Sequence, residues 1–271
     1  MEKPIFVFGC CNSGTTILWQ ALRHHKKLSG PEIEGQDLQD LPICMRHYLG
    51  DATFRLWAHP KFKLCYYVTE DDYNTKDAAK VKEVYNRYTV PGTRLITKSP
   101  ADTLRARLIQ SYFPDAYFIA IVRNGYAVSE GIIRKRKYDP DRPQYEGLFT
   151  TIEEAAEQWF RANTIIVSHQ KFLDNYMIVR YEDLIRKPKH ILLSIFDFCG
   201  LEPDGFHIPT FTQGLNEEQV SRLSDYEIET ITRIAAPMLI HFGYELKNKG
   251  LRGVGGESPY EENILADRIT V

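Results

Sequence analysis

The sequence predicts an α/β fold in which helices cover both faces of a central parallel sheet. Two observations lead to this prediction. Short apolar runs alternate along the chain with segments of helical periodicity, and the strongest run, residues 116–122, is apolar nearly throughout, as expected for a central parallel strand. Strands that alternate with helices pair in parallel, because each helix returns the chain to the end of the sheet where the previous strand began.

The N-terminal unit is predicted to be a strand, a loop and a helix. Residues 5–8 are an apolar run that Gly9 ends, and the periodicity of residues 15–25 predicts an amphipathic helix. Prolines and glycines interrupt residues 30–75, where we expect loops with short helices.

The alternation continues through the rest of the chain. Thr151 and Glu154 match a capping box, which predicts the start of a long helix there. Asp102 predicts the start of another helix, because a carboxylate interacts favourably with the dipole at a helix N-terminus. The sequence predicts helices over 76–88, 101–112, 124–137 and 151–172 and near 188–199 and 224–241, strands over 94–97, 116–122 and 176–180, and a loop over 138–150. Residues 1–247 are therefore predicted to form a single domain, followed by a C-terminal tail over 248–271.

The composition excludes some classes of protein. Lys and Arg number 34 against 36 Asp and Glu, and this balance argues against a nucleic-acid partner, which would favour a basic chain. The five cysteines form no spaced metal pair and no disulfide framework, so we expect a reducing compartment. The N-terminus does not resemble a signal peptide and no apolar run is long enough for a membrane span, so we expect a cytoplasmic protein.

The loop between the first strand and the first helix has the features of an anion site. It reads Gly9-Cys10-Cys11-Asn12-Ser13-Gly14-Thr15-Thr16. Backbone N–H groups in such a loop converge on an anion at the helix N-terminus, which predicts a P-loop-like, three-layer fold. Thr15 stands where nucleoside-triphosphatases carry lysine, and this disfavours kinase chemistry. An ordinary tight turn is the structural alternative.

Two basic residues follow other predicted strands. Arg123 follows residues 116–122, and Lys98 follows residues 94–97. Ligands in α/β sheets bind beyond the carboxyl ends of the strands, and an arginine there can pair with a phosphate through two hydrogen bonds. Either residue alone is also typical of a solvated surface, so the prediction depends on their shared position.

Several segments in order resemble the sulfotransferase family. Besides the Gly9–Thr16 loop, they are Thr97-Lys98-Ser99-Pro100, Tyr112-Phe113-Pro114-Asp115-Ala116, Ile121-Val122-Arg123-Asn124-Gly125-Tyr126-Ala127-Val128-Ser129, Val179-Arg180-Tyr181-Glu182-Asp183-Leu184, Phe198-Cys199-Gly200-Leu201, Ala236-Pro237-Met238-Leu239 and Phe242-Gly243-Tyr244. The resemblance spans residues 4–246 and is closest in motif style to the tyrosylprotein sulfotransferase branch, as a soluble bacterial-type member. It implies transfer of a sulfonate group from 3'-phosphoadenosine 5'-phosphosulfate (PAPS), with adenosine 3',5'-bisphosphate (PAP) as product and no metal.

The resemblance also implies which residues hold the nucleotide. Arg123 is implied to bind the 3'-phosphate, and Tyr181 to line the nucleoside pocket. The residues implied for the 5'-phosphosulfate are Cys11, Asn12, Ser13, Gly14, Thr15 and Thr16.

Two positions depart from the family pattern. Asn12 stands where the family has Lys or Arg, so a charge expected beside the sulfonate is missing, and Lys98 is our candidate to supply it. Gly131 stands eight residues after Arg123, where the family has serine, and Ser129 is our candidate to replace that serine.

The acceptor hydroxyl needs a base. Related branches use a glutamate shortly after the first helix, and spacing favours Glu34, with Glu32 as reserve. Burial in a closed cleft could tune such a carboxylate toward base catalysis. His59 or His47 is the alternative base, and a solvated acidic turn is the structural alternative.

The acceptor itself is not specified by the sequence. We expect residues 35–95 to shape its cleft, for a small-molecule, carbohydrate or lipid acceptor, with a peptide also open. The oligomeric state is not predicted. Alternative functions are a P-loop-type kinase and a nucleotide-binding scaffold without catalysis.

Overall fold

The computed structural model describes residues 2–46, 56–59, 67–137, 150–203 and 208–247. These ranges contain a five-stranded sheet with the order β2-β3-β1-β4-β5, in which every pairing is parallel. The strands are β1 (Ile5–Phe8), β2 (Leu28–Ser29), β3 (Arg94–Lys98), β4 (Tyr117–Val122) and β5 (Tyr176–Arg180). The predicted parallel α/β sheet is therefore confirmed.

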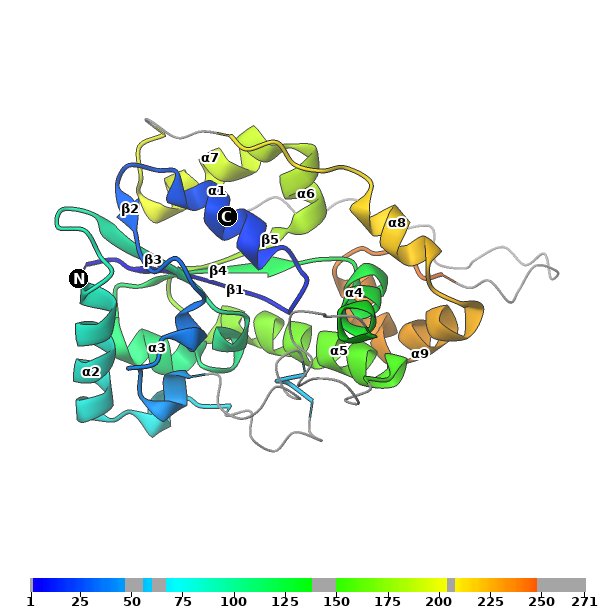
Figure 1. Cartoon of the computed structure of the whole chain (residues 1–271), viewed down its shortest axis with the longest axis horizontal. Coiled ribbons are helices and arrows are strands. Elements are labelled where there is room, and N and C mark those ends of the chain that lie inside the picture. Colours follow the sequence, from blue (N-terminus) through cyan, green and yellow to red (C-terminus); the bar gives the residue numbers. More distant parts are fainter. Residues whose placement is uncertain (1, 47–55, 60–66, 138–149, 204–207, 248–271) are drawn as a thin grey trace.

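Helices lie on both faces of this sheet (Figure 1). The described helices are α1 (Thr15–Arg23), α2 (Thr75–Asn86), α3 (Ala106–Tyr112), α4 (Gly125–Lys137), α5 (Ile152–Ser168), α6 (Tyr181–Arg186), α7 (Pro188–Cys199), α8 (Leu215–Ser221) and α9 (Asp225–His241). Helices α1, α6 and α7 cover one face, and α2, α3 and α5 cover the other. The result is the predicted three-layer arrangement.

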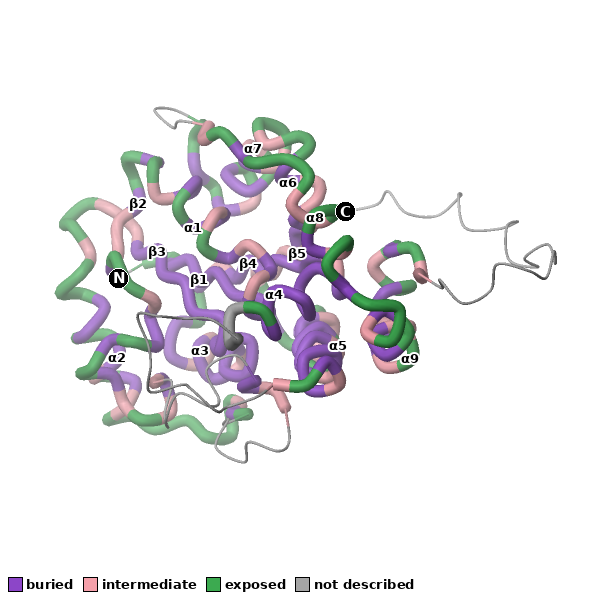
Figure 2. The backbone as a smooth tube through the Cα atoms, turned by 45° about the vertical axis from the view of Figure 1, so that its right-hand side comes forward, coloured by how far each residue is buried: buried purple, intermediate pink, exposed green. Residues whose placement is uncertain are grey.

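The alternation of side chains along β1 explains the two layers of core. Ile5 and Val7 pack with α1, α6 and α7, whereas Phe6 and Phe8 pack with α2 and α3. Both faces of β1 and nearly all of β4 are buried, as Figure 2 shows. A third cluster joins α4, α5 and α9 beside the carboxyl end of β4, around Trp159. The sheet is thus fixed on both faces, and its strand ends are held rigidly.

Most predicted elements are confirmed, with boundaries shifted by a few residues. The capping box of Thr151 and Glu154 is present at the start of α5. That helix ends at Ser168, and the short 3-10 turn His169–Lys171 follows. The short elements β2, α6 and α8 were not predicted, because each is too brief to show a periodicity.

The single helix predicted over 101–112 is wrong. It is divided into the 3-10 turn Pro100–Leu104 and α3, because Arg105 leaves helical geometry with φ −124°. Its guanidinium donates to the backbone oxygens of Met45 (2.6 Å) and Arg46 (3.0 Å). Residues 138–149 of the loop predicted over 138–150, and the tail predicted over 248–271, lie outside the described residues. No helix in the described part of the chain is long and apolar enough to cross a membrane.

Candidate functional site

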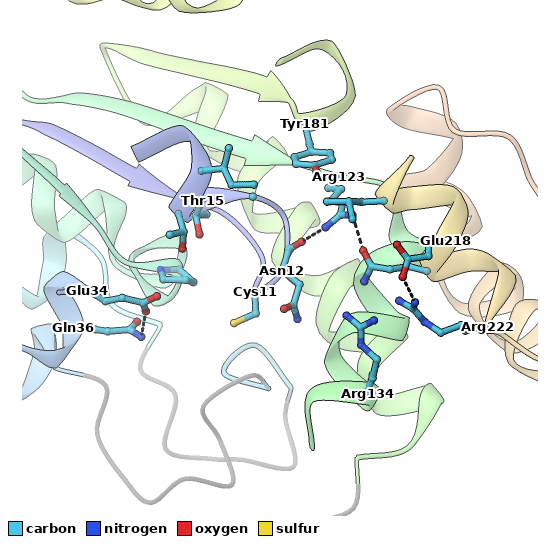
Figure 3. Close-up of a pocket in the computed structure, with 16 residues that line it drawn as sticks. Cys11, Asn12, Thr15, Glu34, Gln36, Arg123, Arg134, Tyr181, Glu218 and Arg222 are labelled. Atoms are coloured by element: carbon cyan, nitrogen blue, oxygen red, sulfur yellow. Dashed lines mark hydrogen bonds and ion pairs between the residues drawn. The ribbon is translucent and has the colours of Figure 1, made fainter. Parts of the chain in front are cut away.

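A cavity of about 440 Å³ lies at the carboxyl ends of β1, β3, β4 and β5. Its lining comes from the loop after β1, the start of α1, the segment after β2, the turns after β3 and β4, α4, the start of α6, and α8 with the residue after it (Figure 3). The lining residues are Cys11, Asn12, Gly14, Thr15, Thr16, Ile17, Glu34, Gln36, Pro100, Arg123, Arg134, Tyr181, Leu215, Glu218, Gln219 and Arg222. This is the position where ligands bind in open α/β sheets.

The loop after β1 presents its backbone to the cavity. Gly14 precedes α1 with φ 96°, and a Cβ there would lie 2.6 Å from Cδ2 of Tyr181, so only glycine fits. Gly14 has no side chain to cap α1, and the N–H groups of the first helical turn suit an anion. Ser13 Oγ and Asn12 Nδ2 are buried, and neither has a hydrogen-bond partner among the described residues. These donors fit an oxyanion.

Arg123 is the main cation at the other side of this loop. Its Nη1 donates to the backbone oxygen of Asn12 (2.9 Å), and its guanidinium stacks 4.3 Å above the ring of Tyr181. Its Nε and Nη2 donate to Asn216 Oδ1 (2.7 Å) and Gln219 Oε1 (2.6 Å). Burial lowers the pKa of Arg123 from its usual value. The stacking on Tyr181 holds the charged guanidinium at the cavity, in a position from which it can pair with a phosphate.

Glu34 and Lys98 form an ion pair at the opposite side of the cavity. Lys98 Nζ donates to Glu34 Oε1, and Gln36 Nε2 donates to Glu34 Oε2 at 2.8 Å. The Lys98 side chain is 3% exposed and the Glu34 side chain 26%, so the carboxylate is the part of the pair that reaches the cavity. Both oxygens of Glu34 are thereby held in a fixed orientation.

A buried polar layer supports Gln36. Its Oε1 accepts from Ser99 Oγ (2.9 Å) and from the backbone N of Ala101 (3.4 Å), which fixes the orientation of its amide. Asp102 lies on the same turn and accepts from Arg105 Nη1 at 3.3 Å. Burial raises the pKa of Asp102 to about 6, against the opposing effect of Arg105. A charged interior therefore lies behind the Glu34–Lys98 pair.

The structure brings most of the predicted site residues together. Eight of them line the cavity, namely Cys11, Asn12, Gly14, Thr15, Thr16, Glu34, Arg123 and Tyr181. Lys98 contacts it through Glu34, and Ser13 is buried in the same loop. Their shared location supports one site rather than scattered surface residues.

Two predicted residues lie elsewhere. Ser129 is fully buried and is not among the residues that line the cavity, so its position does not support it as a replacement for the serine expected at position 131. Glu32 has a side chain 89% exposed, pairs with Arg23 (3.4 Å), and lines a separate surface pocket behind α1. The geometry therefore favours Glu34, the first choice by spacing, over the reserve Glu32 as the predicted base.

Of the two alternative histidines, only His59 is described, and its position does not favour it over Glu34. His59 Nε2 lies 3.3 Å from Glu157 Oε2 and does not line the cavity, and His47 lies outside the described residues. From the segment 35–95, Gln36 lines the cavity, and the buried Trp57 donates from Nε1 to Cys11 Sγ (3.2 Å). Residues 47–55 and 60–66 of this segment lie outside the described residues.

Sequence reasoning missed the contribution of α8. Leu215, Glu218 and Gln219 of this helix line the cavity, and so does Arg222, which comes directly after the helix. Gly214 followed by Glu217 and Glu218 is a signal for a helix start, since acidic residues favour the first turn. Nothing in that local pattern places the helix over Arg123.

The chain matches the family model described as Sulfotransferase family over residues 4–205. This chain belongs to the sulfotransferase family. Among curated relatives, it is 26% identical over 142 residues to the omega-hydroxy-beta-dihydromenaquinone-9 sulfotransferase Stf3 of Mycobacterium tuberculosis, covering 49% of this chain and 36% of the relative. It is 24% identical over 213 residues to the protein-tyrosine sulfotransferase of Drosophila melanogaster, covering 74% of this chain and 38% of the relative.

A solved sulfotransferase domain shares the fold. The sulfotransferase domain of the Synechococcus PCC 7002 olefin synthase superposes with a TM-score of 0.55 at 23% identity, covering 91% of this chain and 98% of that domain. The chain spans less than two fifths of the two curated sulfotransferases, so their activities belong to those longer proteins.

Proposed function

We propose that this chain transfers a sulfonate group from PAPS to a hydroxyl or amine acceptor. The observation that carries the proposal is that the Glu34–Lys98 pair meets the same cavity as the Gly9–Thr16 loop and Arg123. Sulfonate transfer needs a base for the acceptor hydroxyl and groups that bind the anionic donor, and both must meet at one cavity. Membership of the sulfotransferase family supports the same chemistry.

The residues around the cavity fit the donor nucleotide. Backbone N–H groups at the start of α1 and the unpartnered Ser13 Oγ suit the 5'-phosphosulfate. Arg123 suits the 3'-phosphate, and Tyr181, whose ring faces both Gly14 and Arg123, suits the nucleoside. A volume of about 440 Å³ is within the usual size of small-molecule sites.

The proposed chemistry assigns one role to each member of the ion pair. Glu34 accepts the proton of the acceptor hydroxyl while the acceptor oxygen forms its bond to sulfur. The bond between sulfur and the bridging oxygen of the nucleotide breaks, and PAP leaves with that electron pair. Lys98 supplies the positive charge for the sulfonate oxygens, in place of the basic residue missing at Asn12.

The acceptor is proposed only by class. The two curated relatives are named for a menaquinone derivative and for protein tyrosine. We propose a small-molecule, carbohydrate or lipid acceptor, with a peptide as the alternative, and a reducing cytoplasmic location. Cys10, Cys11, Cys44 and Cys199, the cysteines in the described ranges, form no disulfide there, and this supports the proposed location.

Thermal unfolding with different nucleotides tests the proposal. A ligand that binds only the folded chain raises Tm, and PAP at 100 times its Kd should raise it by roughly 5–10 °C. ATP with magnesium should not. The reverse pattern would support a kinase instead. A screen with labelled PAPS against carbohydrate, lipid, phenolic and peptide acceptors then tests transfer, and binding of PAP without any transfer would indicate a scaffold.

A further inference from the structure

Gln219 occupies the space beside Gly131. This residue of α8 is 7% exposed, and a Cβ added to Gly131 would lie 2.9 Å from its Nε2. The same Cβ would lie 3.3 Å from Cγ of Asn12. The missing side chain at position 131 therefore leaves no hole, because an amide from a distant helix fills the volume.

Hydrogen bonds fix the amide of Gln219. Its Nε2 donates to the backbone oxygen of Ala127 and to Glu130 Oε2, both at 3.0 Å, and its Oε1 accepts from Arg123 at 2.6 Å. Both N–H groups and the oxygen are used, so the side chain has one orientation. A rotated amide would place an N–H group against Arg123.

The partner Glu130 is itself immobilised. It is 3% exposed and accepts from Arg222 Nε at 2.7 Å, while Arg134 Nε lies 3.7 Å away. These contacts attach α8 to α4 beside the carboxyl end of β4. Gln219 is therefore a rigid support rather than a surface side chain that happens to touch Arg123.

Arg123 keeps donors for a ligand in this arrangement. Three of its five N–H groups donate to described residues, namely the backbone of Asn12, Asn216 and Gln219. The two others remain for an anion, and Arg123 itself lines the cavity. A guanidinium held on three sides and stacked on Tyr181 binds a phosphate without losing further side-chain freedom.

We propose that Gln219 is a positioning residue for the 3'-phosphate site, and that Gly131 is required to make room for it. This inference rests on the proposed function, since it assigns the 3'-phosphate to Arg123. Helix α8 lies beyond residues 4–205, which match the family model, so the support comes from a part of the chain outside that match.

An exchange of the two residues tests the proposal. Gln219→Ala and the near-isosteric Gln219→Met should each weaken PAP binding about tenfold, the usual effect of losing a hydrogen bond to a charged group. Binding of adenosine 5'-monophosphate, which lacks the 3'-phosphate, should change little. Gly131→Ser should also weaken PAP binding, because its Cβ displaces the amide. The double variant Gly131→Ser/Gln219→Ala should bind PAP more tightly than either single variant.

Titration calorimetry gives both affinities, and turnover assays should show a higher KM for the donor at nearly unchanged kcat. Ser221→Ala, an exposed change on the same helix, is the matched control. Unchanged PAP affinity in both Gln219 variants overturns the proposal. Equal losses for the two nucleotides, or losses that multiply in the double variant, also overturn it. If the wild-type chain does not prefer PAP to adenosine 5'-monophosphate, it is the proposed function that fails.

Discussion

The two ends of the cavity are assembled in different ways. The end that we propose for the donor nucleotide, here the donor end, comprises the Gly9–Thr16 loop, Arg123 and Tyr181, each of which directly follows a strand of the sheet. The end that we propose for the acceptor, here the acceptor end, comprises Glu34, Gln36 and Lys98, and its central ion pair joins residues 64 positions apart. Backbone N–H groups and a stacked arginine dominate the first end, and a buried ion pair dominates the second.

This difference suggests that the residues that bind the donor and the residues that carry out the transfer lie at different ends of the cavity. Strand ends are fixed by the sheet, so the donor end is suited to hold a nucleotide in one position. The acceptor end carries the groups that can move a proton and stabilise charge. Variants at the two ends should therefore change different kinetic constants.

The largest effect is expected at the acceptor end. Glu34→Gln should lower kcat by roughly 10²–10⁴, because the proposed base is removed while the shape is kept. PAP affinity should stay near the wild-type value in calorimetry. The control is Glu32→Gln, whose exposed side chain lies in a separate pocket and should leave turnover intact. Full turnover in the Glu34 variant would contradict the assignment.

The charged interior behind the acceptor end should appear in the pH dependence of stability. The pKa of Asp102 is about 6 in the folded chain against 3.8 ordinarily, so its contribution to stability is present below pH 4 and lost as pH rises through 6. Asp102→Asn does not titrate. The free energy of unfolding of the variant relative to wild type should therefore rise between pH 4 and pH 7, by up to about 3 kcal/mol.

Urea denaturation at a series of pH values measures this difference. Parallel curves for the two proteins would show that Asp102 does not titrate in this range. Arg123→Lys keeps the positive charge and lies apart from Asp102, whose pKa is set by burial, Arg105, Ser99 and Glu34, so it should leave the shape of the pH curve unchanged.

The same substitution at the donor end should change binding. Arg123→Lys keeps the charge but loses the planar fork and the stacking on Tyr181. The KM for the donor should rise about 10–100-fold, with a smaller change in kcat. An equal loss in kcat would mean that the two ends are not separable in the way we propose.

The smallest effect is expected at Gln36, which donates a hydrogen bond to the proposed base Glu34. Gln36→Met removes the hydrogen bond to Glu34 Oε2 and keeps the volume, and it should lower kcat about tenfold. The KM for the donor should not change, which distinguishes this variant from those at the donor end. Steady-state kinetics with varied donor measures both constants, and a rise in KM without loss of kcat would exclude a role in holding the base.

The sequence predicted the donor end better than the acceptor end. The Gly9–Thr16 loop and Arg123 were found because apolar runs mark the strands, and ligand-binding residues follow strand ends. Glu34 was chosen over Glu32 by spacing alone, and only the structure shows that the two side chains point to different pockets. Gln36 was not found, since a lone glutamine in a loop carries no pattern.

The sequence by itself determined the parallel α/β fold, most of its longer strands and helices, and the family, because these depend on periodicities and motifs within short stretches; the same motifs predicted the Gly9–Thr16 loop as the anion site that we propose. The tertiary structure alone decided that Ser129 does not line the cavity and that Gln219 reaches Arg123 across 96 positions of sequence. Such contacts depend on how α8 packs against α4, and that packing is the sum of many weak interactions with no local signature. The residues at the strand ends can therefore be predicted from short stretches of sequence, whereas the supporting contacts from distant helices can be seen only in the folded structure.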